Sequence, residues 1–105
     1  MGRIVVTGMG IISPLGVGLD INWSGILAGR SGISPLFLFE PHEDLATKFA
    51  GQIPDFDPTQ WLSKPETRRY DRFLHIAVGA ALEAVADADL TIDDDNADRV
   101  ATIMG

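Results

Sequence analysis

The longest regular pattern in the chain covers residues 70–85, which read YDRFLHIAVGAALEAV. Apolar side chains recur there at intervals of three and four residues, the spacing that gathers them on one face of an α-helix. Alanines widen this face, so we expect the helix to be covered on more than one side. Just upstream, Ser63-Lys64-Pro65-Glu66 has the form of a capping box, in which Ser63 and Glu66 bond to each other's backbone.

Two short runs rich in β-branched residues lie on either side of this helix. Residues 4–7 are closed by Gly8, and residues 99–104 by Gly105. Such runs are typical of strands buried on both faces of a parallel sheet. A long helix between two of them implies a right-handed βαβ crossover, so the sequence predicts an α/β fold. Because a parallel sheet needs more strands than these, we expect the chain to be a segment of a larger α/β protein.

The glycine-rich residues 8–18 predict a turn whose backbone packs closely or takes positive φ. After this turn, Asp20 is placed to cap a helix over residues 21–28. Gly29 stands just after this helix, where a residue in the left-handed (αL) backbone conformation commonly ends it. The apolar face of this helix consists of Trp23, Ile26 and Leu27.

Three further elements are expected before residue 63. Residues 30–35 are interpreted as a loop, followed by an extended apolar segment up to Pro41. Residues 47–53 are expected to form a short strand. Asp57-Pro58 has the form of an N-cap followed by proline and predicts a one- or two-turn helix that ends near Leu62.

Composition narrows the classes of function. The 105 residues contain 15 acidic and 8 basic side chains, for a net charge of −7, and no cysteine. This balance argues against nucleic acid or an anionic membrane as a partner. No apolar run approaches the roughly 20 residues of a membrane span, and residues 4–6 are too short for the core of a signal peptide. We therefore expect a cytoplasmic protein, without a disulfide, a thiolate zinc site or a cysteine nucleophile in these residues.

The candidate catalytic and ligand-binding patterns are weak. Gly8-Met9-Gly10 follows a predicted strand, but Ser13 replaces the third glycine of a dinucleotide-binding turn. Ser13 also lacks the surroundings of a nucleophile elbow. The two histidines, His42 and His75, do not have the spacing of a metal pair, and residues 93–95 lack the glycine and glutamate of a calcium loop. The sequence predicts no catalytic residue, cofactor site or metal site in these residues.

A basic cluster near the start of the predicted long helix has two interpretations. Its cations oppose the helix dipole by about 0.3–1 kcal/mol each, a cost that would make sense if they bind an acidic partner. The alternative is that they pair with Glu66 and Asp71 on the surface. The cluster holds four of the eight basic residues, Lys64, Arg68, Arg69 and Arg72.

Several blocks of sequence occur in the order known from one family. They are residues 5–16 (VVTGMGIISPLG), Trp23 with residues 27–33 (LAGRSGI), residues 68–73 (RRYDRF) and residues 99–105 (RVATIMG). In these blocks the chain resembles the N-terminal segment of β-ketoacyl-acyl-carrier-protein synthases. The Ser-Pro-Leu-Gly sequence of residues 13–16 is similar to the corresponding motif of the elongating 3-oxoacyl synthases of the second type.

The resemblance implies a layered thiolase-like fold (α/β/α/β/α), with residues 1–105 in its first half, and a homodimer. It implies decarboxylative Claisen condensation of a malonyl-carrier protein with an acyl chain in fatty acid biosynthesis, without a cofactor. The cysteine and two histidines of the family lie beyond Gly105, so no catalytic residue is carried over.

The resemblance also gives the basic cluster a partner. In the family, basic residues at the start of this helix bind the acidic acyl carrier protein. Arg68 and Arg69 match those positions and Lys64 is their neighbour, whereas Pro65 replaces a residue that is often basic.

Two alternatives to a condensing enzyme remain. One is a chain-length-factor-like partner, which shares the fold without the nucleophile, and the other is a small nucleotide-binding α/β module.

Overall fold

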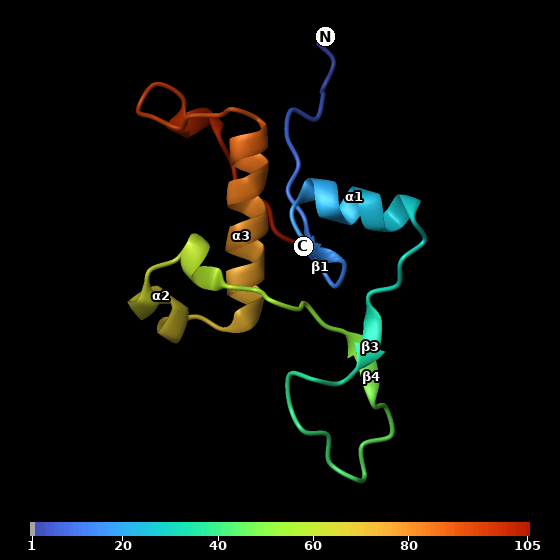
Figure 1. Cartoon of the computed structure of the whole chain (residues 1–105). Helices are drawn as coiled ribbons and strands as arrows, with labels where there is room; N and C mark the ends of the chain where they lie inside the picture. The colour runs from blue at the N-terminus through green and yellow to red at the C-terminus, as the bar shows by residue number, and fades with distance from the viewer. Residues whose placement is uncertain (1) are drawn as a thin grey trace.

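The computed structural model describes residues 2–105 (Figure 1). Within that range the chain forms short antiparallel strand pairs and three α-helices, of which α3 is the longest. In chain order, the elements are β1 (Ile12–Ser13), β2 (Gly16–Val17), α1 (Leu19–Leu27), β3 (Ile33–Pro35), β4 (Phe49–Gly51), the 3-10 turn η1 (Pro58–Gln60), α2 (Lys64–Arg69), α3 (Arg72–Asp87) and the 3-10 turn η2 (Ala97–Arg99).

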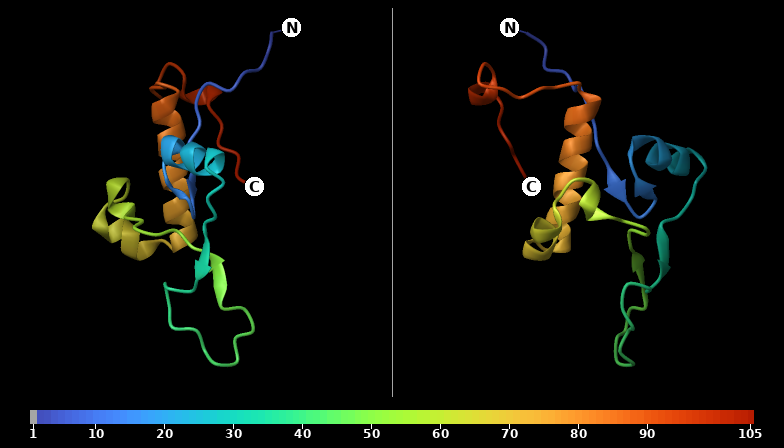
Figure 2. Two further views of the ribbon diagram at one scale, coloured as in Figure 1. Left: turned by 45° about the vertical axis from the view of Figure 1, so that its right-hand side comes forward. Right: turned by 60° about the vertical axis from the view of Figure 1, so that its left-hand side comes forward.

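Helix α3 confirms the predicted long helix and organises the molecule. The extended N-terminal segment runs along it, and α2 lies beside its first turns (Figures 1 and 2). A Cβ at Gly8 would lie 2.5 Å from the carbonyl oxygen of Ala84, and one at Gly10 would collide with the carbonyl of Ala80. The backbone of Met9 donates a 2.9 Å hydrogen bond to Asp87 of α3. The predicted close packing of this glycine segment is therefore confirmed.

The two predicted flanking strands are corrections. Residues 4–7 and 100–104 form no strand, and the backbone around Arg99 belongs to η2. Ile4 is fully exposed and Ile103 is 90% exposed. A strand needs a neighbouring edge to satisfy its backbone groups, and nothing in residues 2–105 supplies one. For the same reason the parallel sheet is absent there, and both sheets are antiparallel and two-stranded.

The predicted turn contains the hairpin of β1 and β2, in which Ile12 pairs with Val17. Helix α1 follows, one to two residues earlier than predicted. Gly18 is its N-cap, whereas Asp20 makes no capping bond and lies in the first turn. The expectation that Asp20 caps the helix was wrong because the helix begins at Leu19, so that Asp20 lies inside it. The Asn22 side chain donates to the Gly18 carbonyl at 2.7 Å. Gly29, with φ of 67°, follows the C-cap as predicted.

The burial of α1 also differs from its apolar pattern. Its buried residues are Asn22 and Gly25, and the predicted apolar face is exposed by half or more. The Asn22 side chain is 2% exposed and also donates to the Gly16 carbonyl at 2.9 Å. Helix α1 is therefore held on the hairpin by the polar bonds of Asn22 together with the packing of Ile21 against Gly16.

Residues 30–35, expected to be a loop, contain β3, which pairs with β4 through Ser34 and Ala50. The prediction of a strand within residues 47–53 is confirmed in shorter form by β4. The connection between them projects away from the helices (Figure 1). Buried Gln52 anchors its start, accepting from the backbone of Phe37 and Leu38 at 3.2 and 3.1 Å.

The described residues bury little apolar surface. The radius of gyration is 17.0 Å, whereas a compact domain of this length has about 13 Å. The accessible surface is 8423 Å², against about 5,700 Å² for a compact monomer of this mass. Within residues 2–105, Leu62 is the one large apolar side chain that is buried.

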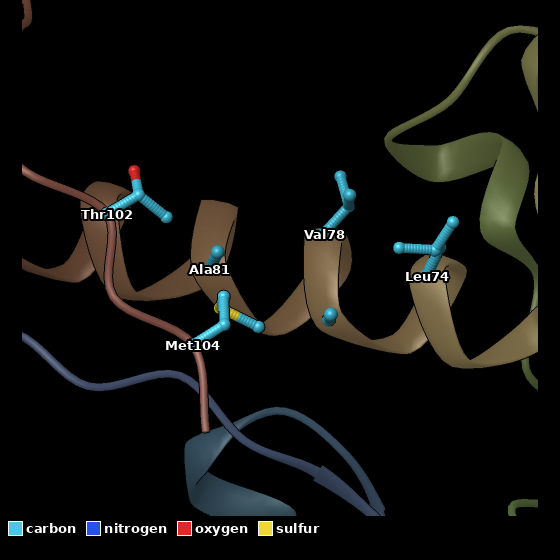
Figure 3. Close-up of a pocket in the computed structure, with 6 residues that line it drawn as sticks. Leu74, Val78, Ala81, Thr102 and Met104 are labelled. Carbon is cyan, nitrogen blue, oxygen red and sulfur yellow. The ribbon is translucent and has the colours of Figure 1, made fainter.

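One uncovered apolar surface is a groove along α3. The C-terminal segment runs past this helix, and the space between them has a volume of about 230 Å³ (Figure 3). It is lined by Leu74, Ala77, Val78, Ala81, Thr102 and Met104. No helix in residues 2–105 is long and apolar enough to cross a membrane.

Candidate functional site

Helix α2 carries the basic cluster and begins with the predicted capping box. Ser63 Oγ accepts from the Glu66 backbone at 3.3 Å. Glu66 Oε2 accepts from both the backbone and the hydroxyl of Ser63, each at 2.8 Å. These bonds from Ser63, with a smaller contribution from the Arg69 charge, hold the pKa of Glu66 below its ordinary value.

The capping box starts α2 and not the long helix, which corrects the electrostatics expected for the cluster. Tyr70 takes an extended conformation, with φ of −108° and ψ of 146°, and Asp71 is the N-cap of α3. Arg68 and Arg69 therefore lie in the last turn of α2, where the helix dipole favours cations. The expectation that the cluster opposes a helix dipole was wrong for these two residues, whereas Lys64 and Arg72 are the first residues of α2 and α3 and do lie at helix N-termini.

The three cations of α2 face solvent. Lys64, Arg68 and Arg69 are exposed, and none of them makes an ion pair or side-chain hydrogen bond with any residue in the described range 2–105. Lys64 and Arg68 are four residues apart and share one side of the helix. Glu66, the expected surface partner, is occupied by Ser63. The pairing alternative is not realised, and three cations are available to an acidic surface.

Arg72, the fourth member of the predicted cluster, has a structural role. Its Nη2 donates to the Ile53 carbonyl at 3.1 Å, and its guanidinium carbon lies 5.2 Å from the ring centroid of Phe56. Phe56 in turn stacks on Trp61 at 5.9 Å. Arg72 thus ties residues 53–61 to the start of α3, and the candidate site reduces to Lys64, Arg68 and Arg69.

The turn η1 holds the segment that leads into α2. Asp57 caps it as predicted, accepting from the backbone of Thr59 at 2.9 Å and from its hydroxyl at 2.6 Å. These two bonds, the hydroxyl first, lower the pKa of Asp57. The helix ends at Gln60, sooner than predicted, because Trp61 leaves helical geometry and packs on Gly79, where a Cβ would lie 3.0 Å from its ring.

The remaining candidate residues have local structural roles. The Ser13 hydroxyl bonds to the Asn22 side chain and accepts from the Leu15 backbone at 3.1 Å, as a turn residue would. His42 is an exposed loop residue 3.6 Å from Asp44. His75 is buried in α3, so the two histidines occupy separate elements.

Two buried polar side chains, Asn22 and Gln52, were missed from the sequence. Asn22 lies between the apolar Ile21 and Trp23, and neither polar residue belongs to a local capping or turn pattern. Their partners are backbone groups that the fold brings to them, so no pattern in the sequence could have identified these roles.

Comparison with known proteins defines the class. The profile of the family described as "Beta-ketoacyl synthase, N-terminal domain" matches residues 1–105. The chain therefore belongs to the β-ketoacyl synthase family, which confirms the resemblance given by its sequence blocks.

Individual relatives show which members of the family are similar to this chain. The 3-oxoacyl-[acyl-carrier-protein] synthase 2 of Synechocystis is 45% identical over 103 residues, which cover 98% of this chain and 24% of the relative. The Vibrio harveyi protein of the same name is 39% identical, covering 98% of this chain and 25% of its own length. This chain therefore spans about a quarter of the curated relatives it matches.

A solved structure agrees with the sequence comparisons. The structure named "The ishigamide ketosynthase/chain length factor" is 40% identical and superimposes with a TM-score of 0.75, covering 86% of this chain and 22% of that chain. The mixed helix and strand arrangement of this chain is thus similar to part of a chain in that structure. Family membership favours this interpretation over the nucleotide-binding module.

Proposed function

We propose that the complete protein is a 3-oxoacyl-acyl-carrier-protein synthase that elongates fatty acids. The observation that supports this most strongly is the match of nearly the whole chain to proteins of that name at up to 45% identity. In this reaction, malonyl-carrier protein loses carbon dioxide and its carbanion attacks an enzyme-bound acyl thioester. Residues 1–105 contain no cysteine, so the acyl-bearing nucleophile belongs elsewhere in the proposed enzyme.

The proposal includes an architecture. Residues 1–105 form the N-terminal segment of the first half of a layered thiolase-like fold, in a cytoplasmic homodimer. The large exposed apolar surface of the described residues supports the layered fold, because such surface is stable when other layers cover it.

The direct test is the condensation itself. The complete protein, given an acyl-carrier protein and malonyl-carrier protein, is expected to release one carbon dioxide for each 3-oxoacyl product. A second candidate is a chain-length-factor-like partner, which is favoured by the likeness to the ishigamide ketosynthase/chain length factor. Condensation only after addition of a partner ketosynthase would support that candidate and contradict the first.

Within this function, we assign α2 to binding of the acidic carrier protein through Lys64, Arg68 and Arg69. The three side chains are exposed and uncommitted, on a chain whose net charge is −7. Such a local basic surface on an acidic protein steers an acidic partner to one place.

The double variant Arg68→Glu with Arg69→Glu tests this assignment. We expect the Kd for the carrier protein to rise about tenfold or more, with the largest loss at low salt, because attraction becomes repulsion. Arg3→Glu with Lys48→Glu is the charge-matched control, since both side chains are exposed and lie outside α2 and outside residues 4–7 and 100–104. Equal Kd values for the two double variants would contradict the assignment.

A further inference from the structure

Helix α2 is too short to fix its own direction. It has six residues, and isolated helices below about 12 residues are marginal in water. Its last intrahelical bond runs from the Tyr70 backbone to the Glu66 carbonyl at 3.0 Å, which leaves the Thr67 carbonyl without a donor from the helix. The position of the three cations therefore depends on what holds the end of α2.

One buried side chain supplies that hold. Nε2 of His75 lies 3.0 Å from the Thr67 carbonyl oxygen. A carbonyl oxygen only accepts, so Nε2 carries the proton of this bond. His75 is 9% exposed, and its own backbone donates to the Asp71 carbonyl at 3.2 Å in the first turn of α3. The bond thus joins the last turn of α2 to the first turn of α3.

The other contacts that hold α2 and the residues before it lie nearer to the N-terminus than the last turn of α2. The Ser63 capping box closes the beginning of α2 on itself and touches no other element. The Trp61 ring fixes the preceding turn η1 on Gly79. Of the side-chain hydrogen bonds found in residues 2–105, the bond from His75 is the one that links α2 to α3.

We propose that His75 is a positioning residue for carrier-protein binding. By bonding the Thr67 carbonyl it sets the direction in which Lys64, Arg68 and Arg69 project, without touching the partner. This inference rests on the proposed function, because it assumes that α2 binds the carrier protein.

The test compares His75→Phe, which fills the volume without donating, with His75→Gln, whose amide can donate to Thr67. In the complete protein, we expect His75→Phe to raise the carrier-protein Kd about fivefold and His75→Gln to stay within about twofold of wild type. Turnover of a small acyl thioester without a carrier is expected to be unchanged in both. His42→Phe is the matched control, at an exposed loop histidine.

The substrate comparison separates positioning from general stability. A purely structural role would lower activity on the carrier-bound and carrier-free substrates in the same proportion, and that result would overturn the proposal. An unchanged Kd in His75→Phe would overturn it as well. Should His75→Phe not fold, His75→Met serves in the same comparison, since it is also buried and apolar.

A separate measurement distinguishes failure of this inference from failure of the proposed function. Loss of the His75 bond is expected to speed amide hydrogen exchange at residues 67–70, whatever α2 binds. Faster exchange in His75→Phe, with an unchanged Kd in the Arg68→Glu and Arg69→Glu variant, would contradict the function assigned to α2. Unchanged exchange would contradict the role of His75 itself.

Discussion

Residues 53–75 and the two ends of the chain differ in how they are held. In residues 53–75, polar and aromatic contacts follow one another closely, from the bond of Arg72 to Ile53 up to the bond of His75 to Thr67. The end segments, residues 4–7 and 100–104, carry apolar side chains with little cover, and Ile4 and Ile103 are almost wholly exposed.

The difference shows which part of the chain can be specified locally. Caps and short-range bonds place α2 and its cations with partners that lie within this segment. Strands gain stability from neighbours on both sides and both faces, and residues 4–7 and 100–104, for which residues 2–105 supply no such neighbours, form no strand. Helix α2 is thus placed by contacts within residues 53–75, whereas the apolar ends have no comparable cover within residues 2–105.

The largest expected effect concerns the ends. We expect isolated residues 1–105 to be poorly soluble or molten, without a cooperative melt, because the apolar segments at both ends have no neighbouring strand to pair with. In the complete protein, amide exchange at residues 4–7 and 100–104 is expected to slow by about a thousandfold or more as those segments become strands. A cooperative, reversible melt of the monomeric segment would contradict this view of the ends.

A smaller effect is expected where the N-terminal segment crosses α3. Gly10→Ala places a Cβ against the Ala80 carbonyl, and overpacking of this kind costs about 1–3 kcal/mol. Denaturant unfolding of the complete protein measures the loss. Gly2→Ala is the control, because nothing lies within 4 Å of its added Cβ; equal stability of the two variants would show that the segment does not pack on α3.

In the locally held segment, Ser63→Ala removes the capping box of α2 and is expected to cost about 1 kcal/mol. It also removes the hydroxyl bond to the Glu66 carboxylate but keeps the backbone bond, which lowers the pKa of Glu66 most, so this pKa is expected to rise part of the way toward its ordinary value of 4.5. An NMR titration of Glu66 checks the shift. Ser24→Ala, at an exposed serine within α1, is the control for stability, and a Glu66 pKa that does not move would contradict the capping geometry.

The smallest effect is a pH dependence of the two caps. The folded-state pKa values of Asp57 and Glu66 are lowered, so their contribution is fully present above the ordinary values of 3.8 and 4.5 and is lost as pH falls through the lowered values. We therefore expect the destabilisation caused by Ser63→Ala to shrink below about pH 4.5. A constant difference in unfolding free energy from pH 7 to pH 3 would argue against this linkage.

The caps could be predicted from sequence because they depend on residues within three positions of one another. Asp57-Pro58 and the pair of Ser63 and Glu66 were correctly identified for this reason. The break between α2 and α3 could not be, since the helical spacing runs on through Tyr70 and the break is held by a bond from His75 to Thr67.

The prediction of two flanking strands was wrong because strands, unlike caps, depend on partners far away in the sequence. Their composition is right for a parallel sheet, but pairing depends on partners that residues 2–105 do not contain. The candidate site was predicted in part: Lys64, Arg68 and Arg69 are exposed as a docking surface requires, whereas Arg72 is committed to Ile53 and Phe56. The partners of the Arg72 guanidinium depend on which distant residues pack beside it, and the local sequence pattern does not contain that information.

A charge swap tests the central claim, that the cations of α2 bind an acidic carrier protein, most directly. Carrier-protein variants with single acidic residues changed to lysine are titrated against the complete protein carrying Arg68→Glu and Arg69→Glu. We predict that one such variant binds the reversed protein more tightly than the unaltered carrier does, and binds wild type more weakly. If every carrier variant binds both proteins in the same order, α2 does not contact the carrier and the claim is contradicted.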